Sequence, residues 1–122
     1  MQCTISKSCE IKGIGLHSGR ACRVTLKPAP INSGRRFTVG SNVIPAHYTA
    51  IVDSNYCTVL GKGEAHVATV EHLLAAAMGL GVDNLIIDVE GDEIPILDGS
   101  AAPWVQTLID CGIRTQGAKG SH

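Results

Sequence analysis

The chain has 122 residues, an apolar content of 44% and a formal net charge of −1 at neutral pH. This length suffices for one domain with a hydrophobic core. No apolar run is long enough to span a membrane, and the N-terminus lacks the apolar core of a signal peptide. We therefore expect a cytoplasmic protein without a transmembrane segment.

The charges are unevenly distributed along the chain. Up to Gly40, seven basic residues accompany the single acid Glu10, whereas three basic residues accompany ten acids in the remainder. Such a basic region can attract an anionic ligand, although it is more often the solvated face of strands. Nucleic-acid binding is not expected, because no basic stripe is interleaved with aromatic residues.

The cysteines are odd in number and form no C-x-x-C pair. Small buried thiols in a reducing cytoplasm explain this pattern better than a disulfide framework or a structural zinc site. The residues concerned are Cys3, Cys9, Cys22, Cys57 and Cys111.

The chain begins with a pattern typical of strands. Residues 4–11 predict a first strand, and G-I-G-L-H-S-G over residues 13–19 predicts a loop whose backbone can approach a ligand closely. A dinucleotide-binding loop would lead into a helix, but the following A-C-R-V-T-L-K alternates with period two. It predicts a strand with Cys22, Val24 and Leu26 facing inward. His17 in the loop is a site candidate, although a single loop histidine is usually only solvated.

Further short strands are expected over residues 36–39, around residues 43–44 and over residues 56–60, followed by a turn at 62–64. The stretch from 68 to 81 then predicts a short, largely buried helix, with Thr69 as its N-cap and Gly79 or Gly81 ending it. Its apolar residues recur at steps of three and four. They are Val67, Val70, Leu73, Leu74 and Ala77.

Glu71 and His72 fall in the first turn of this helix. One interpretation is a metal-hydrolase pair, with His72 as a ligand and Glu71 as the base that deprotonates metal-bound water. The alternative is that the helix dipole stabilises the negative charge of Glu71, while His72 forms a hydrogen bond with a nearby loop. The pair does not belong to an H-E-x-x-H motif, so further ligands must come from elsewhere.

After the helix, residues 85–89 predict a strand, and residues 90–92 a turn into a returning strand over 93–97. Ser100 can cap a second helix that ends at Gly112. Its apolar stripe comprises Trp104, Val105, Leu108 and Ile109.

These elements predict an α+β two-layer sandwich: a mainly antiparallel sheet of about five strands with two helices on one face. Leu73, Leu74, Trp104 and Leu108 are expected in its core. The domain is expected to span residues 1–115, and residues 116–122 to be a disordered tail or cloning remnant.

Five blocks of the sequence together resemble a known family. They are G-I-G-L-H-S-G, V-T-L-K-P-A-P, T-V-E-H-L-L-A-A, G-L-G-V-D-N and E-I-P-I-L-D-G-S-A-A-P-W-V. In this order and spacing they are similar to UDP-3-O-acyl-N-acetylglucosamine deacetylase, the zinc-dependent enzyme of bacterial lipid A biosynthesis. The resemblance covers nearly all of residues 3–113, and it implies the fold type called ribosomal protein S5 domain 2-like.

The resemblance implies that His72 is a zinc ligand and that Glu71 is the general base. It implies that the other two zinc ligands, a His and an Asp, lie in a second domain of similar fold. It implies that the same domain supplies a Lys and a His that assist catalysis, together with most of the acyl-chain passage. The chain is therefore expected to be the amino-terminal domain alone, with an incomplete zinc site and without activity until the carboxyl-terminal domain joins it.

The resemblance also places His17, Tyr56, Cys57 and Thr58 near the substrate cleft. Cys57 is then a residue of the cleft wall and not a metal ligand. Asp98 could also be interpreted as a metal ligand, but its position ahead of a helix cap favours a role in a turn. Two hypotheses stay open: half of a zinc deacetylase acting on UDP-3-O-acyl-N-acetylglucosamine, or a non-catalytic binding module that retains the fold.

Overall fold

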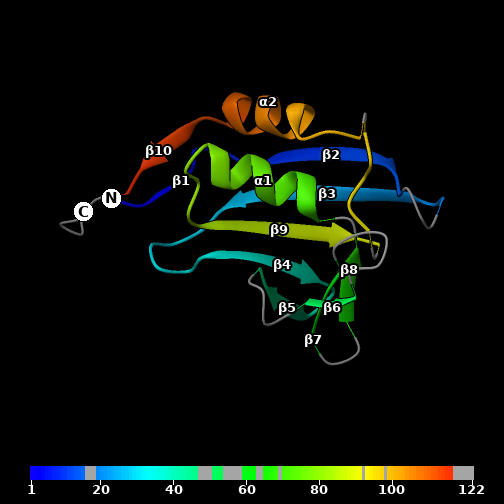
Figure 1. The fold of residues 1–122 in the computed structure, drawn as a ribbon. Coiled ribbons are helices and arrows are strands. Elements are labelled where there is room, and N and C mark those ends of the chain that lie inside the picture. The colour runs from blue at the N-terminus through cyan, green and yellow to red at the C-terminus, as the bar shows by residue number, and fades with distance from the viewer. Residues whose placement is uncertain are drawn as a thin grey trace.

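In a computed structural model of the chain, two helices cover one face of a five-stranded sheet (Figure 1). The residues that the structure describes are 1–15, 19–46, 51–53, 59–62, 65–68, 70–91, 93–97 and 99–116. Within them, no helix is long and apolar enough to cross a membrane.

The central sheet is mixed but mainly antiparallel, which confirms the predicted fold class. Only β4 and β9 run parallel, and every other neighbouring pair in this sheet is antiparallel. The inward positions Cys22, Val24 and Leu26 are buried, as the alternation predicts. The order across the sheet is β2 (Cys9–Ile14), β3 (Ala21–Pro28), β9 (Leu85–Glu90), β4 (Arg35–Val39) and β5 (Asn42–Pro45).

Two smaller sheets flank the central one. One pairs the first strand with the last, β1 (Cys3–Ile5) with β10 (Ile113–Thr115), and places Thr4 opposite Arg114. The other is an antiparallel meander of β6 (Ile51–Asp53), β7 (Val59–Lys62) and β8 (Ala65–Ala68).

The prediction of one strand over residues 4–11 is wrong, because the chain bends between β1 and β2. At the bend, the Ser6 N–H donates to the Gly112 carbonyl at 2.7 Å and the Lys7 N–H to the Cys111 carbonyl at 3.3 Å. These bonds direct the backbone toward the end of the second helix instead of along one sheet.

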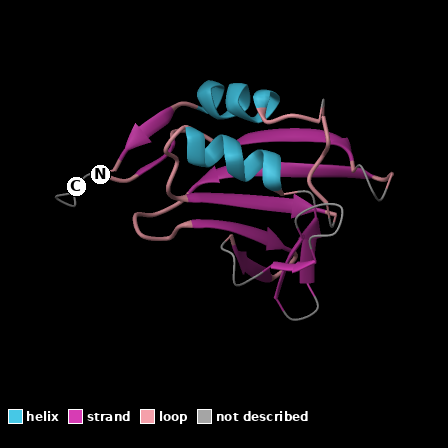
Figure 2. Ribbon diagram, viewed as in Figure 1, coloured by secondary structure: helices cyan, strands magenta, loops and turns pink. Residues whose placement is uncertain are grey.

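Both predicted helices form, α1 (Glu71–Gly79) and α2 (Ala102–Cys111), and both lie on the same side of the sheet (Figure 2). Leu73, Trp104 and Leu108 are completely buried. Leu74 is half-buried and packs against this core, whereas Ile109 is 51% exposed.

The helix α1 starts later than its sequence pattern indicates. Val67 is buried but belongs to β8, a strand that the sequence does not predict. Of the turn predicted at 62–64, Lys62 ends β7, and residues 63 and 64 lie outside the described residues. The N-cap position is Val70, which makes no side-chain capping bond, while Thr69, predicted to cap, lies outside the described residues. At the other end Gly79 is the last helical residue and Gly81 has a positive φ of 73°.

The segment 93–97 does not form the predicted hairpin with β9. Both edges of β9 are already occupied, by β3 and β4, so no returning strand can pair there. Instead Pro95 bridges to Gly15, and the Ile96 N–H donates to the Ile14 carbonyl at 3.0 Å. This approach requires Gly13, because a Cβ there would lie 2.8 Å from the Cβ of Pro95.

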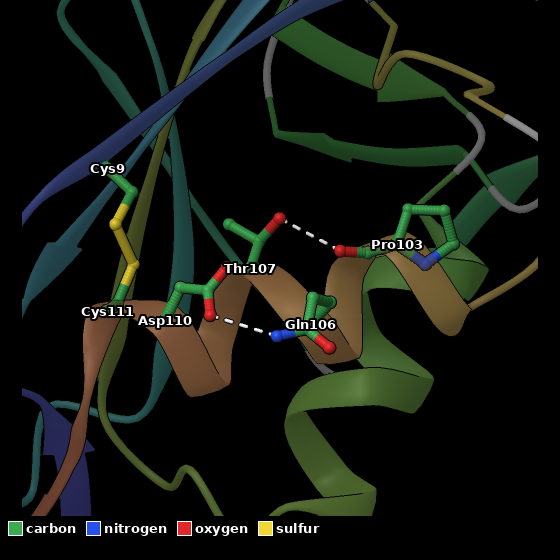
Figure 3. The surroundings of a disulfide bond; sticks show 6 residues. All are labelled: Cys9, Pro103, Gln106, Thr107, Asp110 and Cys111. Atoms are coloured by element: carbon green, nitrogen blue, oxygen red, sulfur yellow. Dashed lines mark hydrogen bonds between the residues drawn. A yellow bond between two sulfur atoms is a disulfide. The ribbon is translucent and has the colours of Figure 1, made fainter.

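A disulfide joins Cys9 in β2 to Cys111 at the end of α2, which corrects the expectation that all cysteines are thiols (Figure 3). The two residues are 102 positions apart, and the backbone bonds from Ser6 and Lys7 to the end of α2 help to bring their segments together. Cys3 and Cys22 keep their thiols. Cys57 lies outside the described residues.

Gln116 also corrects an expectation, because it belongs to the domain and not to a tail. It is 8% exposed, and its side chain accepts from Asn84 Nδ2 at 2.6 Å and donates to the Ala29 carbonyl at 2.9 Å. The packed domain thus reaches at least residue 116. Residues 117–122 lie outside the described residues.

Candidate functional site

Glu71 and His72 are the first two residues of α1, and both side chains are half-buried. The buried face of the helix is set by Leu73, Ala76 and Ala77. Because Glu71 and His72 come directly before Leu73, they lie at the margin of the core, where a side chain can be held by packing and still meet a ligand.

The start of α1 also suits the charge of Glu71. The first N–H groups of a helix have no intrahelical partner, and the dipole gives this end partial positive charge. Val70 supplies no side-chain cap. Glu71 is the only acid in this first turn, so its carboxylate lies near these N–H groups.

The topology places this helix end over one end of the sheet. The helix runs antiparallel to β9, to which a short connection joins it, so its first turn lies toward the end of β9 at Glu90 (Figure 1). The connection between β2 and β3 is at the same end of the sheet. Its base is closed by two backbone bonds, from the Gly15 N–H to the Arg20 carbonyl and from the Gly19 N–H to the Gly15 carbonyl, each at 3.0 Å.

The other predicted site residues cannot be placed beside this pair. His17, Tyr56, Cys57 and Thr58, together with Asp98, lie outside the described residues. Their predicted roles stay predictions.

The described residues contain no group of three or more His, Cys, Asp or Glu side chains that could hold a metal ion. His72 and Glu71 do supply donors of the kinds that zinc accepts, an imidazole nitrogen and a carboxylate oxygen. The pair therefore fits part of a zinc site. A complete site requires donors from elsewhere.

Comparisons with known proteins support the interpretation of the motifs. The family described as UDP-3-O-acyl N-acetylglycosamine deacetylase matches residues 2–122. A UDP-3-O-acyl-N-acetylglucosamine deacetylase of Legionella pneumophila (strain Corby) is 50% identical over 121 residues, covering 96% of this chain. The proteins of the same name from Trichormus variabilis and Teredinibacter turnerae are 46% and 44% identical, over 94% and 96% of the chain.

The chain spans about two fifths of the length of these relatives, 40% for the Legionella protein and 42% for the Trichormus protein. Within that span, the match includes the glycine-rich segment, the start of α1 and the segment leading into α2. The chain belongs to the UDP-3-O-acyl N-acetylglycosamine deacetylase family.

Proposed function

We propose that this chain supplies the general base and one metal ligand of a zinc-dependent hydrolase in bacterial lipid A biosynthesis. The reaction is removal of the N-acetyl group from UDP-3-O-acyl-N-acetylglucosamine. The observation that carries the proposal is the adjacent pair Glu71 and His72 at the uncapped start of α1. The names of the relatives, all deacetylases of this substrate, support the reaction class.

Glu71 is proposed to accept a proton at its carboxylate as water attacks the acetamide carbonyl. A positioned base of this kind contributes about 10²–10⁴-fold to the rate. His72 is proposed to offer the lone pair of one ring nitrogen to the metal, which requires a neutral imidazole. A bound zinc ion would supply Lewis-acid chemistry, making water more acidic and polarising a carbonyl.

The remaining ligands are proposed to come from outside the described residues. A catalytic zinc site normally has three protein ligands, and His72 is one. Because the chain spans about two fifths of its relatives, we place the other two ligands and the groups that stabilise the oxyanion in a partner domain. The chain alone is then proposed to bind zinc weakly and to be inactive. The alternative function is a binding module that retains the fold without catalysis.

The proposal can be tested by joining the chain to the remaining part of the Legionella relative. The fusion should retain about one zinc equivalent and hydrolyse the substrate, whereas the chain alone should do neither. His72→Ala should lose the zinc. Glu71→Gln should keep the zinc and lose about 10²–10⁴-fold in turnover, because its amide cannot accept the proton.

Asp110→Asn is the matched control, since Asp110 is an exposed acid of α2 that bonds only Gln106 in the described part of the chain. Metal content and turnover of this variant should equal those of the parent fusion. A Glu71→Gln fusion with parental turnover, or a His72→Ala fusion with full zinc, would contradict the assigned roles. A folded fusion with neither zinc nor turnover would favour the binding module.

A further inference from the structure

A pocket lies at the other end of α1 from Glu71, where β4 begins and the chain enters β9. Its volume is about 430 Å³, within the range of small-molecule sites. Three charged residues line it, Arg35, Arg36 and Asp83, together with the apolar Val43, Pro45 and Ala46. It is therefore distinct from the candidate deacetylase site and independent of the proposed function.

Several basic side chains of the first third already have partners. Arg23 donates to Glu90 and to Glu10, which raises the pKa of its guanidinium, and Lys27 lies 3.8 Å from Asp88. In the pocket, Arg35 Nη1 donates to the Val82 carbonyl at 2.6 Å.

Arg36 differs from these residues. Within the described part of the chain it makes no ion pair, and its Nε is shielded from solvent without an acceptor. Leaving a buried donor unpaired is unfavourable, more so for a charged group. Asp83 does not pair with the Arg36 guanidinium. Its carboxylate accepts from the Cys3 N–H at 2.9 Å and forms no salt bridge with either arginine.

We propose that this pocket binds a small organic monocarboxylate. Two arginines and one aspartate among the lining residues sum to one positive charge, which matches a monoanion. A guanidinium presents a planar fork that pairs with both oxygens of a carboxylate, so Arg36 is the primary contact. The carbon skeleton of the ligand lies against Val43, Pro45 and Ala46, of which Val43 is 38% exposed in the free chain.

Binding includes a rotation of the Arg36 side chain, because its Nε is shielded in the free chain. The side chain has several rotatable bonds and starts on the sheet face away from the helices, as Phe37, the next residue, is buried beneath them. This movement gives the shielded donor its acceptor. It leaves the backbone of β4 in place.

The test is a titration of the ¹⁵N-labelled chain with acetate, butyrate, hexanoate and inorganic phosphate, followed by amide chemical shifts. We expect saturable shifts at Gly34, Arg36 and Ala46 that are strongest for hexanoate. Each methylene that becomes buried should tighten binding by up to about fourfold, the equivalent of roughly 0.8 kcal/mol. Arg36→Gln should weaken hexanoate binding at least tenfold, and Arg36→Lys, which keeps the charge without the fork, should also weaken it.

Arg114→Gln is the matched control, because Arg114 is exposed in β10 and should leave the affinity unchanged. The proposal is overturned if hexanoate gives no saturable shifts, or if phosphate binds more tightly than hexanoate. Equal losses of hexanoate affinity in Arg36→Gln and Arg114→Gln would also overturn the proposal. If Arg36→Gln fails to fold, Arg36→Lys decides the question with the same readout.

Discussion

Asn84 shows how much one polar residue organises in this small domain. It is 1% exposed, in the connection from α1 to β9. Its side-chain nitrogen donates to Gln2 at 2.7 Å and to Gln116 at 2.6 Å, and its side-chain oxygen accepts from the Gly34 N–H at 2.8 Å. Both ends of the described chain are thus bonded to a single buried amide.

Replacing Asn84 by Ala should lower the free energy of unfolding by about 2–4 kcal/mol, because several buried polar groups lose their partner at once. Asn42→Ala is the matched control, since Asn42 is exposed and its side chain donates one long bond, 3.4 Å, to the Val39 carbonyl. It should change stability by less than about 0.5 kcal/mol. Urea unfolding measures both. Similar losses for the two variants would contradict a structural role for the network.

For single residues, the sequence predicts burial where it follows from a local periodic pattern. It does not predict burial that depends on partners far away in the chain. Leu73 and Trp104 are expected in the core because they recur at helical spacing, and both are fully buried. Gln116 is expected in the tail because nothing near it is periodic. Its burial depends on Asn84 and Ala29, which lie 32 and 87 positions away.

The elements are connected by close backbone approaches that only particular residues permit. The segment 93–97 lies against β2 because Gly13 has no side chain at that position. The same segment precedes α2 in the chain, while β2 precedes the predicted site residue His17. One glycine therefore permits the contact between β2 and the segment 93–97.

Gly13→Ala should destabilise the chain by about 1–3 kcal/mol, because the new methyl group would lie 2.8 Å from Pro95 Cβ. Gly79→Ala should change the stability in the opposite direction. Gly79 is helical and lacks a positive φ, and beyond its chain neighbours and the backbone of its own helix, no atom of the described residues would lie within 4 Å of an added methyl group. Alanine there should therefore stabilise the chain by up to about 1 kcal/mol. The two variants are compared by their midpoints of urea unfolding. A Gly13→Ala chain as stable as the parent would contradict the predicted clash with Pro95.

For the site, the sequence correctly places Glu71 and His72 in the first turn of α1, although Val67, which is counted in the apolar spacing, belongs to β8. It does not predict β8, because the four residues of that strand adjoin the helical pattern and have no turn signal between them. The hairpin expected over residues 93–97 does not form, because β9 already pairs with β3 and β4. No local pattern in the sequence shows that both edges of β9 are occupied.

At the scale of the whole molecule, the Cys9–Cys111 bond closes a loop of 102 positions. A loop of this size removes much conformational freedom from the unfolded chain, which corresponds to about 2–5 kcal/mol of stability. Reduction with dithiothreitol should lower the free energy of unfolding by that amount. The shift should be visible in urea unfolding, with the bond verified by alkylation and mass measurement.

Two variants control for other effects of the reductant. Cys9→Ser should unfold like the reduced parent whether or not dithiothreitol is present. Cys3→Ser, which removes a free thiol and leaves the bond intact, should respond like the parent. A response of Cys9→Ser as large as that of the parent would show that the bond does not carry the effect.

The pairing of β1 with β10 has a consequence for synthesis of the protein. Thr4 meets Arg114, so the first strand has no partner until nearly the whole domain has been translated. At about 5–20 residues per second, β1 would wait for roughly 5–20 seconds at the ribosome. During this time its edge and the apolar side chain of Ile5, which the finished fold buries completely, stay open to other nascent chains.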